Sequence, residues 1–259
     1  MAIYGNNQGR RGTVYNRIVV RNIIDEVRQE LVGKIDEGYK IVAKRYFREE
    51  VEMMGIRTPD VRKIARMYYA VVIDLSKEEI FELCEKLLKS ECFEEKTVAI
   101  DWIFRLRDKY KKGDFARFKG WIVKYVDNWV HCDDFCTHVM GAFLNKYPSK
   151  IEIVVNKWSK AKNRWLRRAS AVSLIYVIAR GGEELKYAFQ VSDLLMTDKD
   201  DLVQKGYGWL LKEVADRYPS EVYKYVVKNQ DVMPRTALRY AIEKMPKDWR
   251  KPLLRGSEV

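Results

Sequence analysis

An almost unbroken series of helical segments is the feature that most constrains the fold of this 259-residue chain. After about residue 16, apolar residues recur in nearly every stretch at the three- and four-residue spacing of an amphipathic helix. Glycine and proline separate these stretches, and no hairpin dipeptide joins two alternating strand-like runs. The pattern predicts an all-α protein, with helices over residues 17–31, 34–50, 58–73, 77–88, 94–110, 114–126, 133–146, 149–158, 164–179, 183–195, 200–218, 220–227 and 235–245.

The chain also contains an internal repeat. The Tyr-Pro-Ser segment Tyr147–Ser149 recurs as Tyr218–Ser220, an offset of 218 − 147 = 71 residues, and Arg168 falls on Arg239 at the same offset. Two helix pairs of about 35 to 40 residues give such an offset, which is typical of helical-repeat proteins. The repeat predicts a HEAT-like α–α superhelix with a concave basic groove; a non-repetitive helical domain is the alternative. We expect one domain over residues 17–250, between a flexible tail at 1–16 and a C-terminal tail at 251–259.

The charge of the chain indicates its class of partner. Lysine and arginine number 49 against 37 acidic residues, which gives a formal net charge of +12. In a folded domain, this surplus of positive charge indicates nucleic acid as the partner more strongly than an acidic protein or a membrane surface. There is no apolar run of about 18 residues that could span a membrane, and the N-terminal segment lacks the apolar core of a secretory signal. We therefore expect a cytoplasmic protein, most simply a monomer.

Cysteine and histidine are sparse, which limits the available chemistry. The chain has four cysteines and two histidines. Cys132 and Cys136 are four residues apart with His131 and His138 nearby, but no second cluster would complete a structural zinc site. We interpret both thiols as small buried side chains. The sequence has no P-loop, GxGxxG or HExxH motif, and it leaves little room for a Ser-His-Asp triad. No cofactor or metal is expected.

The segment from Asp127 to Phe135 concentrates polar and aromatic residues between two predicted helices. Asp133 or Asp134 is a natural N-cap or first-turn residue for the helix that runs to Lys146. Capping explains one of the two carboxylates. It does not explain the other, nor Trp129, which this interpretation places in the preceding loop.

Trp209 lies on the unexpected side of its predicted helix. The apolar residues of the 200–218 segment share one face, and Trp209 points roughly 150° away from it, next to Lys205. A large aromatic side chain in this position is either covered by another element or offered to a ligand. Periodicity alone leaves both alternatives open.

Basic residues gather at two predicted helix starts. Arg164, Arg167 and Arg168 open one helix, and Arg235 and Arg239 open another. Cations at a helix N-terminus oppose the helix dipole, but together with the N-terminal N–H groups they suit a phosphate. A solvated first turn is the alternative.

Three short motifs resemble the helical-repeat DNA alkylation repair glycosylases of the AlkD type. That family carries a Trp–Asp–x–Val/Cys–Asp segment, then a Trp–x–x–Arg helix start, then a Gly–Trp within an inner helix. Here the motifs are Trp129–Asp133, Trp165–Arg168 and Gln204–Trp209, and the family's early Gly-Ile-x-x-Pro element matches Gly55–Pro59. The resemblance extends over about residues 35 to 250. The sequence departs from the pattern at Val130, where many members have Asp, and at Asn128, where some have Trp.

The resemblance implies a function and a set of site residues. Asp133 would be the catalytic carboxylate, Trp129 and Trp209 would embrace the sugar of the damaged nucleotide, and Arg168 would lie near its phosphate, with Arg167 as the alternative. The substrate would be double-stranded DNA with positively charged alkylated purines such as 3-methyladenine or 7-methylguanine, excised without base flipping. The remaining basic residues predicted to contact DNA are Arg164, Arg167, Lys205, Arg235 and Arg239.

Two other classes of function remain open at the level of sequence. The departure at Val130 keeps a noncatalytic protein that binds distorted or branched DNA under consideration. A protein–protein scaffold is a common use of helical repeats, but it would favour an apolar or acidic groove over a basic one.

Overall fold

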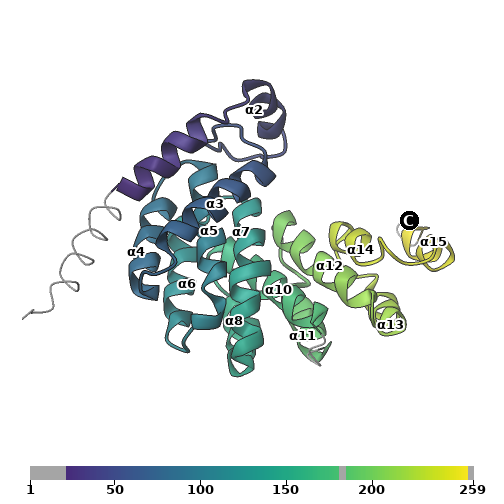
Figure 1. Ribbon diagram of the computed structural model, residues 1–259. Helices are drawn as coiled ribbons and strands as arrows, with labels where there is room; N and C mark the ends of the chain where they lie inside the picture. The colour runs from purple at the N-terminus through teal and green to yellow at the C-terminus, as the bar shows by residue number, and fades with distance from the viewer. Residues whose placement is uncertain (1–21, 181–184, 256–259) are drawn as a thin grey trace, which may run out of the picture. The chain divides into compact units, whose positions relative to one another are not determined.

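Helices form all the regular structure of residues 22–180 and 185–255, which are the residues described by the computed structural model (Figure 1). This part of the chain contains no β-strand, so the all-α prediction is confirmed. The chain divides into two compact units, residues 1–106 and 107–259. The predicted tail at 1–16 lies outside the described residues.

Unit 1, residues 1–106, is organised around a buried helix. It contains a helix over residues 22–32, α2 (Glu37–Lys44), α3 (Thr58–Val72), α4 (Lys77–Leu88) and α5 (Phe93–Arg105). Helix α5 packs against α3 and α4, and every residue of α5 from Glu94 to Ile103 is buried. The indole Nε1 of Trp102 donates to the carbonyl of Ala65 at 2.8 Å, which satisfies the polar end of a fully buried ring.

Helix α4 shows why some predicted boundaries are right. The side chain of Ser76 accepts a hydrogen bond from the backbone N–H of Glu79, and the Glu79 carboxylate accepts one from the backbone N–H of Ser76. This capping box satisfies two N–H groups that have no partner within the helix. The helix begins at Lys77 and ends at Leu88, as predicted from the sequence.

The predicted helix over 34–50 is wrong at both ends. Asp36 is the N-cap, because its carboxylate accepts from the N–H of Tyr39 at 2.8 Å, and α2 ends at Lys44. Beyond Lys44 the chain turns, and Phe47 packs edge-on against Phe93 with ring centroids 5.8 Å apart. This aromatic pair packs on a small core that includes Ala43. The contact takes the place of the further helical turns that the apolar spacing predicted.

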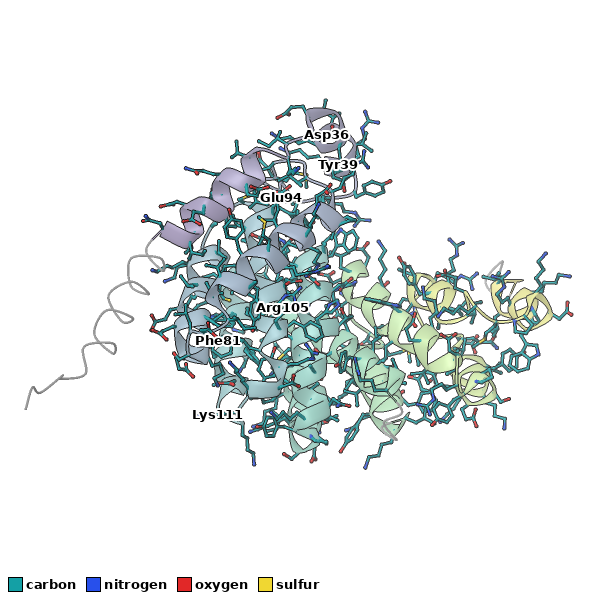
Figure 2. The ribbon with its side chains drawn as sticks, viewed as in Figure 1. Asp36, Tyr39, Phe81, Glu94, Arg105 and Lys111 are labelled. Carbon is teal, nitrogen blue, oxygen red and sulfur yellow. The ribbon has the colours of Figure 1, made fainter. Side chains whose placement is uncertain are left out.

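A buried carboxylate holds the segment that leads into α3. Glu94, labelled in Figure 2, accepts hydrogen bonds from the backbone N–H groups of Met54, Gly55 and Ile56 at 2.9, 2.8 and 3.0 Å. Gly55 has φ +90°, and a Cβ atom there would lie 2.5 Å from the Cβ of Lys40. Only glycine fits this turn, since other residues would meet both backbone strain and a steric clash.

Unit 2, residues 107–259, contains the remaining helices. They are α6 (Asp114–Tyr125), α7 (Trp129–Asp134), α8 (Gly141–Lys146), α9 (Ile151–Ile153), α10 (Arg164–Ala179), α11 (Leu185–Leu195), α12 (Asp201–Ala215), α13 (Pro219–Asn229), α14 (Arg235–Ala241) and α15 (Lys247–Arg255). Short 3₁₀ turns occupy Arg107–Lys109 and Pro148–Lys150, and π-helical turns occupy Phe135–Met140 and Val154–Trp158. Helix α15 continues past residue 250, which the sequence predicted to end the domain.

Three helices of unit 2 lie side by side and form its centre. Helix α12 packs between α10 and α14, and α10 also contacts α7 and α8 (Figure 1). Most of α10 is buried, including its residues from Arg168 to Ile175. This arrangement brings segments separated by 30 or more residues into contact, and it positions the predicted site residues of α7, α10 and α12.

The internal repeat has a structural counterpart. Tyr147 has φ −128° and ψ 70°, and Tyr218, 71 residues later, has φ −130° and ψ 57°. Each tyrosine precedes a proline at the first position of the next helical segment, where the fixed proline φ suits a helix start. The repeated Tyr-Pro-Ser segment therefore marks equivalent turns between successive helices.

Candidate active site

The start of α7 differs from the sequence prediction. Asn128 is the N-cap: its Oδ1 accepts from the backbone N–H of His131 at 3.0 Å, and its side chain is buried. The helix therefore begins at Trp129, so the predictions that Trp129 lies in a loop and that Asp133 or Asp134 caps the helix are wrong. Trp129 and Asp133 are four residues apart in α7, a spacing that places both on one helix face.

Asp133 forms a bidentate ion pair with Arg168 of α10. The Arg168 Nε donates to Oδ1 at 2.7 Å and Nη2 donates to Oδ2 at 2.8 Å, across 35 residues of sequence. The Nη1 of Arg168 donates to the carbonyl oxygen of Leu202 in α12. The Arg168 side chain is 6% exposed and that of Asp133 is 15% exposed. Three helices thus fix one carboxylate, which keeps limited access to solvent.

Opposing effects act on the protonation of Asp133. Burial raises the pKa of the Asp133 carboxyl, the hydrogen bonds and charge of Arg168 lower it, and the nearby charge of Asp134 raises it again. Burial is the largest effect, so the pKa of Asp133 lies above the ordinary value for aspartate. A perturbed carboxyl that is both buried and specifically paired is typical of a functional site.

Gly206 makes room for Arg168, and the sequence prediction did not include it. A Cβ atom at position 206 would lie 3.1 Å from the Cγ of Arg168 and 3.4 Å from its Nη1. Glycine inside a helix costs about 1 kcal/mol relative to alanine, so its occurrence in α12 requires a reason. The reason is the close passage of the Arg168 side chain towards Leu202. An unexplained glycine in the middle of a predicted helix was the available signal.

Trp209 lies on the same stripe of α12 as the residues that meet Arg168. Leu202, Gly206 and Trp209 are spaced by four and three residues, which places them along one helix face. The Trp209 side chain is half-buried, and its Nε1 donates to Oε1 of Glu213 at 3.0 Å. The stripe of α12 that carries Trp209 is therefore the one on which Leu202 and Gly206 meet Arg168 of α10.

Three of the five basic residues predicted to contact DNA form ion pairs with the acidic segment at the start of α12. The Nε of Arg164 lies 2.8 Å from Oδ2 of Asp200, and that of Arg167 lies 2.6 Å from Oδ2 of Asp198. Lys205 pairs with the nearby Asp201 at 3.2 Å. Arg167 also donates to the carbonyls of residues 161 and 162. The Arg164 and Arg167 pairs hold the first turn of α10 against the segment that leads into α12, whereas the Lys205 pair lies within α12.

The other two predicted basic residues lie on α14 and differ from each other. Arg235 donates to the carbonyl oxygens of Leu253 and Leu254 at 3.0 and 2.8 Å, which ties α14 to α15. Arg239, the repeat equivalent of Arg168, is exposed. The two arginines related by the repeat thus have different surroundings, one in a buried ion pair and one on the surface.

The thiols of Cys132 and Cys136 are buried, as expected for packing side chains. The Sγ of Cys132 lies 3.7 Å from the carbonyl oxygen of Trp165 and donates to it. Burial raises the pKa of the Cys132 thiol well above its ordinary range. The Cys132 thiol therefore joins α7 to α10, and Cys136 is buried in the π-helical turn that follows α7.

The family model described as "DNA alkylation repair enzyme" matches residues 27–245. The chain belongs to the DNA alkylation repair enzyme family. The match includes both units in large part and all four residues Trp129, Asp133, Arg168 and Trp209. No curated protein matches the sequence.

Solved structures show the same fold. A predicted DNA alkylation repair enzyme from Enterococcus faecalis superposes with a TM-score of 0.73 and 16% sequence identity, over 83% of this chain and 98% of that one. AlkD2 from Streptococcus mutans superposes with a TM-score of 0.55 and 19% identity, over 73% and 90%. Family members of this type are helical-repeat proteins, in agreement with the predicted class of fold. Within the described residues, no helix is long and apolar enough to cross a membrane.

Proposed function

We propose that this DNA alkylation repair protein is a DNA glycosylase, which removes positively charged alkylated purines from double-stranded DNA by hydrolysis of the N-glycosidic bond. The observation that carries the proposal is the Asp133 carboxylate, fixed by two hydrogen bonds from Arg168 and still partly open to solvent. Membership of the repair family supports the choice of DNA as the partner.

The proposed reaction needs one well-placed negative charge. A purine alkylated at N3 or N7 already carries a positive charge, which weakens its bond to the sugar. Loss of the base as a neutral molecule leaves an oxocarbenium-like sugar, and a nearby carboxylate stabilises this cation as carboxylates do in glycoside hydrolysis. Water then adds to C1′, forms the C1′–OH bond and gives up its proton to the surrounding solvent. Asp133 is the residue that would stabilise the cation and orient this water.

The contacts of Asp133 leave it able to act in this way. An ionised carboxylate has about four lone-pair sites, and Arg168 uses one on each oxygen. One further site on each oxygen can face the sugar and the water. We propose that the main task of Arg168 is to orient this carboxylate, since three of its N–H donors are used inside the protein. Its contact with a DNA phosphate, implied by the family resemblance, stays a prediction.

The tryptophans supply aromatic surface for a cationic substrate. Trp129 is on the same face of α7 as Asp133, and Trp209 is on the stripe of α12 whose Leu202 and Gly206 meet Arg168 of α10. The face of an indole ring attracts a cation within about 6 Å, by about 0.5 to 2 kcal/mol. We propose that both rings contact the damaged nucleotide while its base stays in the stack. Lesion choice would then depend on the weakness of the glycosidic bond.

Release of 7-methylguanine from methylated duplex DNA tests the proposed function. The wild-type protein is expected to release the free base faster than the same DNA loses it without enzyme, as measured by chromatography of the soluble products. Release no faster than the enzyme-free rate would contradict glycosylase activity.

The ion pair itself favours a second candidate function. A guanidinium bound to both oxygens of Asp133 offsets the charge that would stabilise the sugar cation. Arg168 and Asp133 could then serve only to join α7 to α10 in a protein that binds distorted DNA without cutting it. Salt-sensitive binding to such DNA with no base release would identify this function.

The proposed role of Asp133 predicts the pH dependence of the reaction. Only the ionised carboxylate can stabilise the sugar cation, so the rate should fall as pH falls through the pKa of Asp133. Because burial raises this pKa, the fall should occur above pH 4, the ordinary aspartate range. Arg168 lowers the pKa, so Arg168→Gln should move the fall to still higher pH. Single-turnover rates from pH 4 to 8, corrected for enzyme-free release, measure the pH of this fall in the wild type and in Arg168→Gln. An identical pH profile in the two proteins would contradict the assignment of the titrating group to Asp133.

Gly206→Ala tests whether the geometry of the pair matters. The added methyl group would press on the Cγ of Arg168, and a shift of that side chain would move the carboxylate it holds. We expect a base-release rate about tenfold lower, since small displacements of a catalytic group are costly. The unfolding free energy should change by no more than about 1 kcal/mol, because alanine is the better helix former.

A matched glycine substitution serves as the control. Gly120 lies in α6, and a Cβ atom at that position would have no heavy atom within 4 Å. Gly120→Ala should therefore leave the base-release rate unchanged. Equal rates for the Gly206→Ala variant and the wild type would show that the carboxylate does not depend on the space at position 206.

A further inference from the structure

The indole of Trp209 is held by a carboxylate on its own helix. Its Nε1 donates to Oε1 of Glu213, one turn further along α12, at 3.0 Å. The Glu213 side chain is 28% exposed, so this bond forms at the surface of unit 2 rather than in the core. An indole N–H at a surface can bond to water, so its use of a protein carboxylate requires another explanation.

A lysine from a different element fixes that carboxylate. Lys244, in the turn after α14, has its Nζ 3.3 Å from both oxygens of Glu213 and 2.6 Å from Oδ2 of Asp216. Isolated surface ion pairs contribute little, but a cation shared by two carboxylates restricts all three side chains. We name Glu213, Asp216 and Lys244 the indole clamp.

The junction that supports the indole clamp is tightly packed. A Cβ atom at Gly208 would lie 2.7 Å from the carbonyl oxygen of Ala237 and 2.8 Å from the Cβ of Tyr240, so α12 and α14 are in close contact directly beside Trp209. This close contact fixes the position of the turn that carries Lys244 relative to α12. The orientation of the Trp209 ring is therefore linked to α14, which supplies no residue to the proposed catalytic group.

We propose that Glu213 is a positioning residue, held in place by Lys244, that sets the orientation of the Trp209 ring towards the damaged nucleotide. This role rests on the proposed glycosylase function. The hydrogen bond fixes the side-chain rotamer before DNA arrives, which removes an ordering cost from the reaction. A carboxylate acceptor also shifts electron density into the indole and makes the ring face more attractive to a cation.

The experiment compares two acidic residues at the same junction. Glu213→Leu removes the acceptor of the indole N–H, and Glu213→Gln keeps an oxygen that can accept it. Glu243→Gln is the matched control, because Glu243 pairs with Lys212 of α12 at 3.3 Å across the same junction. Each protein is examined in two ways. The exchange of the Trp209 indole N–H with solvent is followed by NMR, with Trp209→Phe used to assign the resonance. Single-turnover release of 7-methylguanine and the affinity for methylated DNA are then measured.

In Glu213→Leu the indole N–H should exchange with solvent at least about tenfold faster, as expected for loss of a hydrogen bond to a charged group. Base release should slow by about tenfold at saturating enzyme, with DNA affinity changed by less than about threefold. Glu213→Gln should restore most of the rate, and Glu243→Gln should match the wild type in both measurements.

Two results would overturn the proposal. Unchanged indole exchange in Glu213→Leu would show that Glu213 does not hold the ring in solution. A full base-release rate in the same variant would show that the held orientation is not used in the reaction. Failure of the glycosylase function is distinguishable, because it would appear as absent release by the wild type, while indole exchange would still report on the clamp.

Discussion

Asp133→Asn should lower the rate of 7-methylguanine release by at least about 100-fold, because the neutral amide cannot stabilise the sugar cation. The amide has nearly the shape of the carboxylate, and its oxygen can still accept one hydrogen bond from Arg168. The measurement is single-turnover release from methylated duplex DNA, at enzyme concentrations that saturate the substrate. Affinity for the same DNA should change far less than the rate, since the substitution removes an interaction that forms mainly in the transition state.

Two further variants separate chemistry from folding. Asp133→Asn leaves the buried Arg168 guanidinium without its counter-charge, which can cost about 3 to 5 kcal/mol of stability. Combining it with Arg168→Gln removes both charges and should restore the fold without restoring base release. Asp134→Asn changes the adjacent carboxylate, which lies 3.1 Å from Nδ1 of His138, and should keep most of the activity. A rate near wild type in a folded Asp133→Asn protein would refute the assignment of the catalytic carboxylate.

Glu94→Ala should destabilise unit 1 by about 4 kcal/mol. The carboxylate accepts three backbone N–H bonds and is buried, so its removal leaves donors that water reaches poorly. The segment around Gly55 would lose its support, because its φ of +90° is held in place by these bonds. Hydrogen exchange resolved by peptide should show lost protection over residues 51–57 first.

The control for this substitution is a carboxylate in the same segment. Glu52 is exposed, and Glu52→Ala should change the unfolding free energy by no more than about 0.5 kcal/mol. Peptides from α10 and α12 in unit 2 should keep their exchange protection in Glu94→Ala. Equal protection of residues 51–57 in the wild type and in Glu94→Ala would show that the three hydrogen bonds contribute little.

Local signals account for the parts of the fold that could be predicted. The helix at 77–88 has its start marked by a serine and a glutamate three residues apart, and its observed bounds agree with the prediction. The helix at 34–50 lacks a stop signal in the sequence, and it ends early because Phe47 packs against Phe93, which lies 46 residues later. Tertiary packing of this kind cannot be read from periodicity.

In the candidate site, too, local motifs could be predicted from the sequence and contacts between distant segments could not. Motif order and family resemblance were enough to single out Trp129, Asp133, Arg168 and Trp209, and the structure places Asp133 in contact with Arg168. The aspartate partners of Arg164 and Arg167 lie 36 and 31 residues away in the sequence, so their ion pairs could not be predicted. The sequence prediction misplaces the start of α7, because the cap is Asn128 and the two aspartates predicted as caps lie inside the helix.

Gly206 shows that the site requires free space beside Arg168 as well as reactive groups. The proposed catalytic carboxylate is oriented by an arginine, and that arginine reaches it through space left by a missing side chain. A relative with alanine at this position would keep every reactive group and still hold its carboxylate differently. An aspartate and an arginine at the positions of Asp133 and Arg168 are therefore not enough to indicate activity in such a protein. A glycine at the position of Gly206 is needed as well.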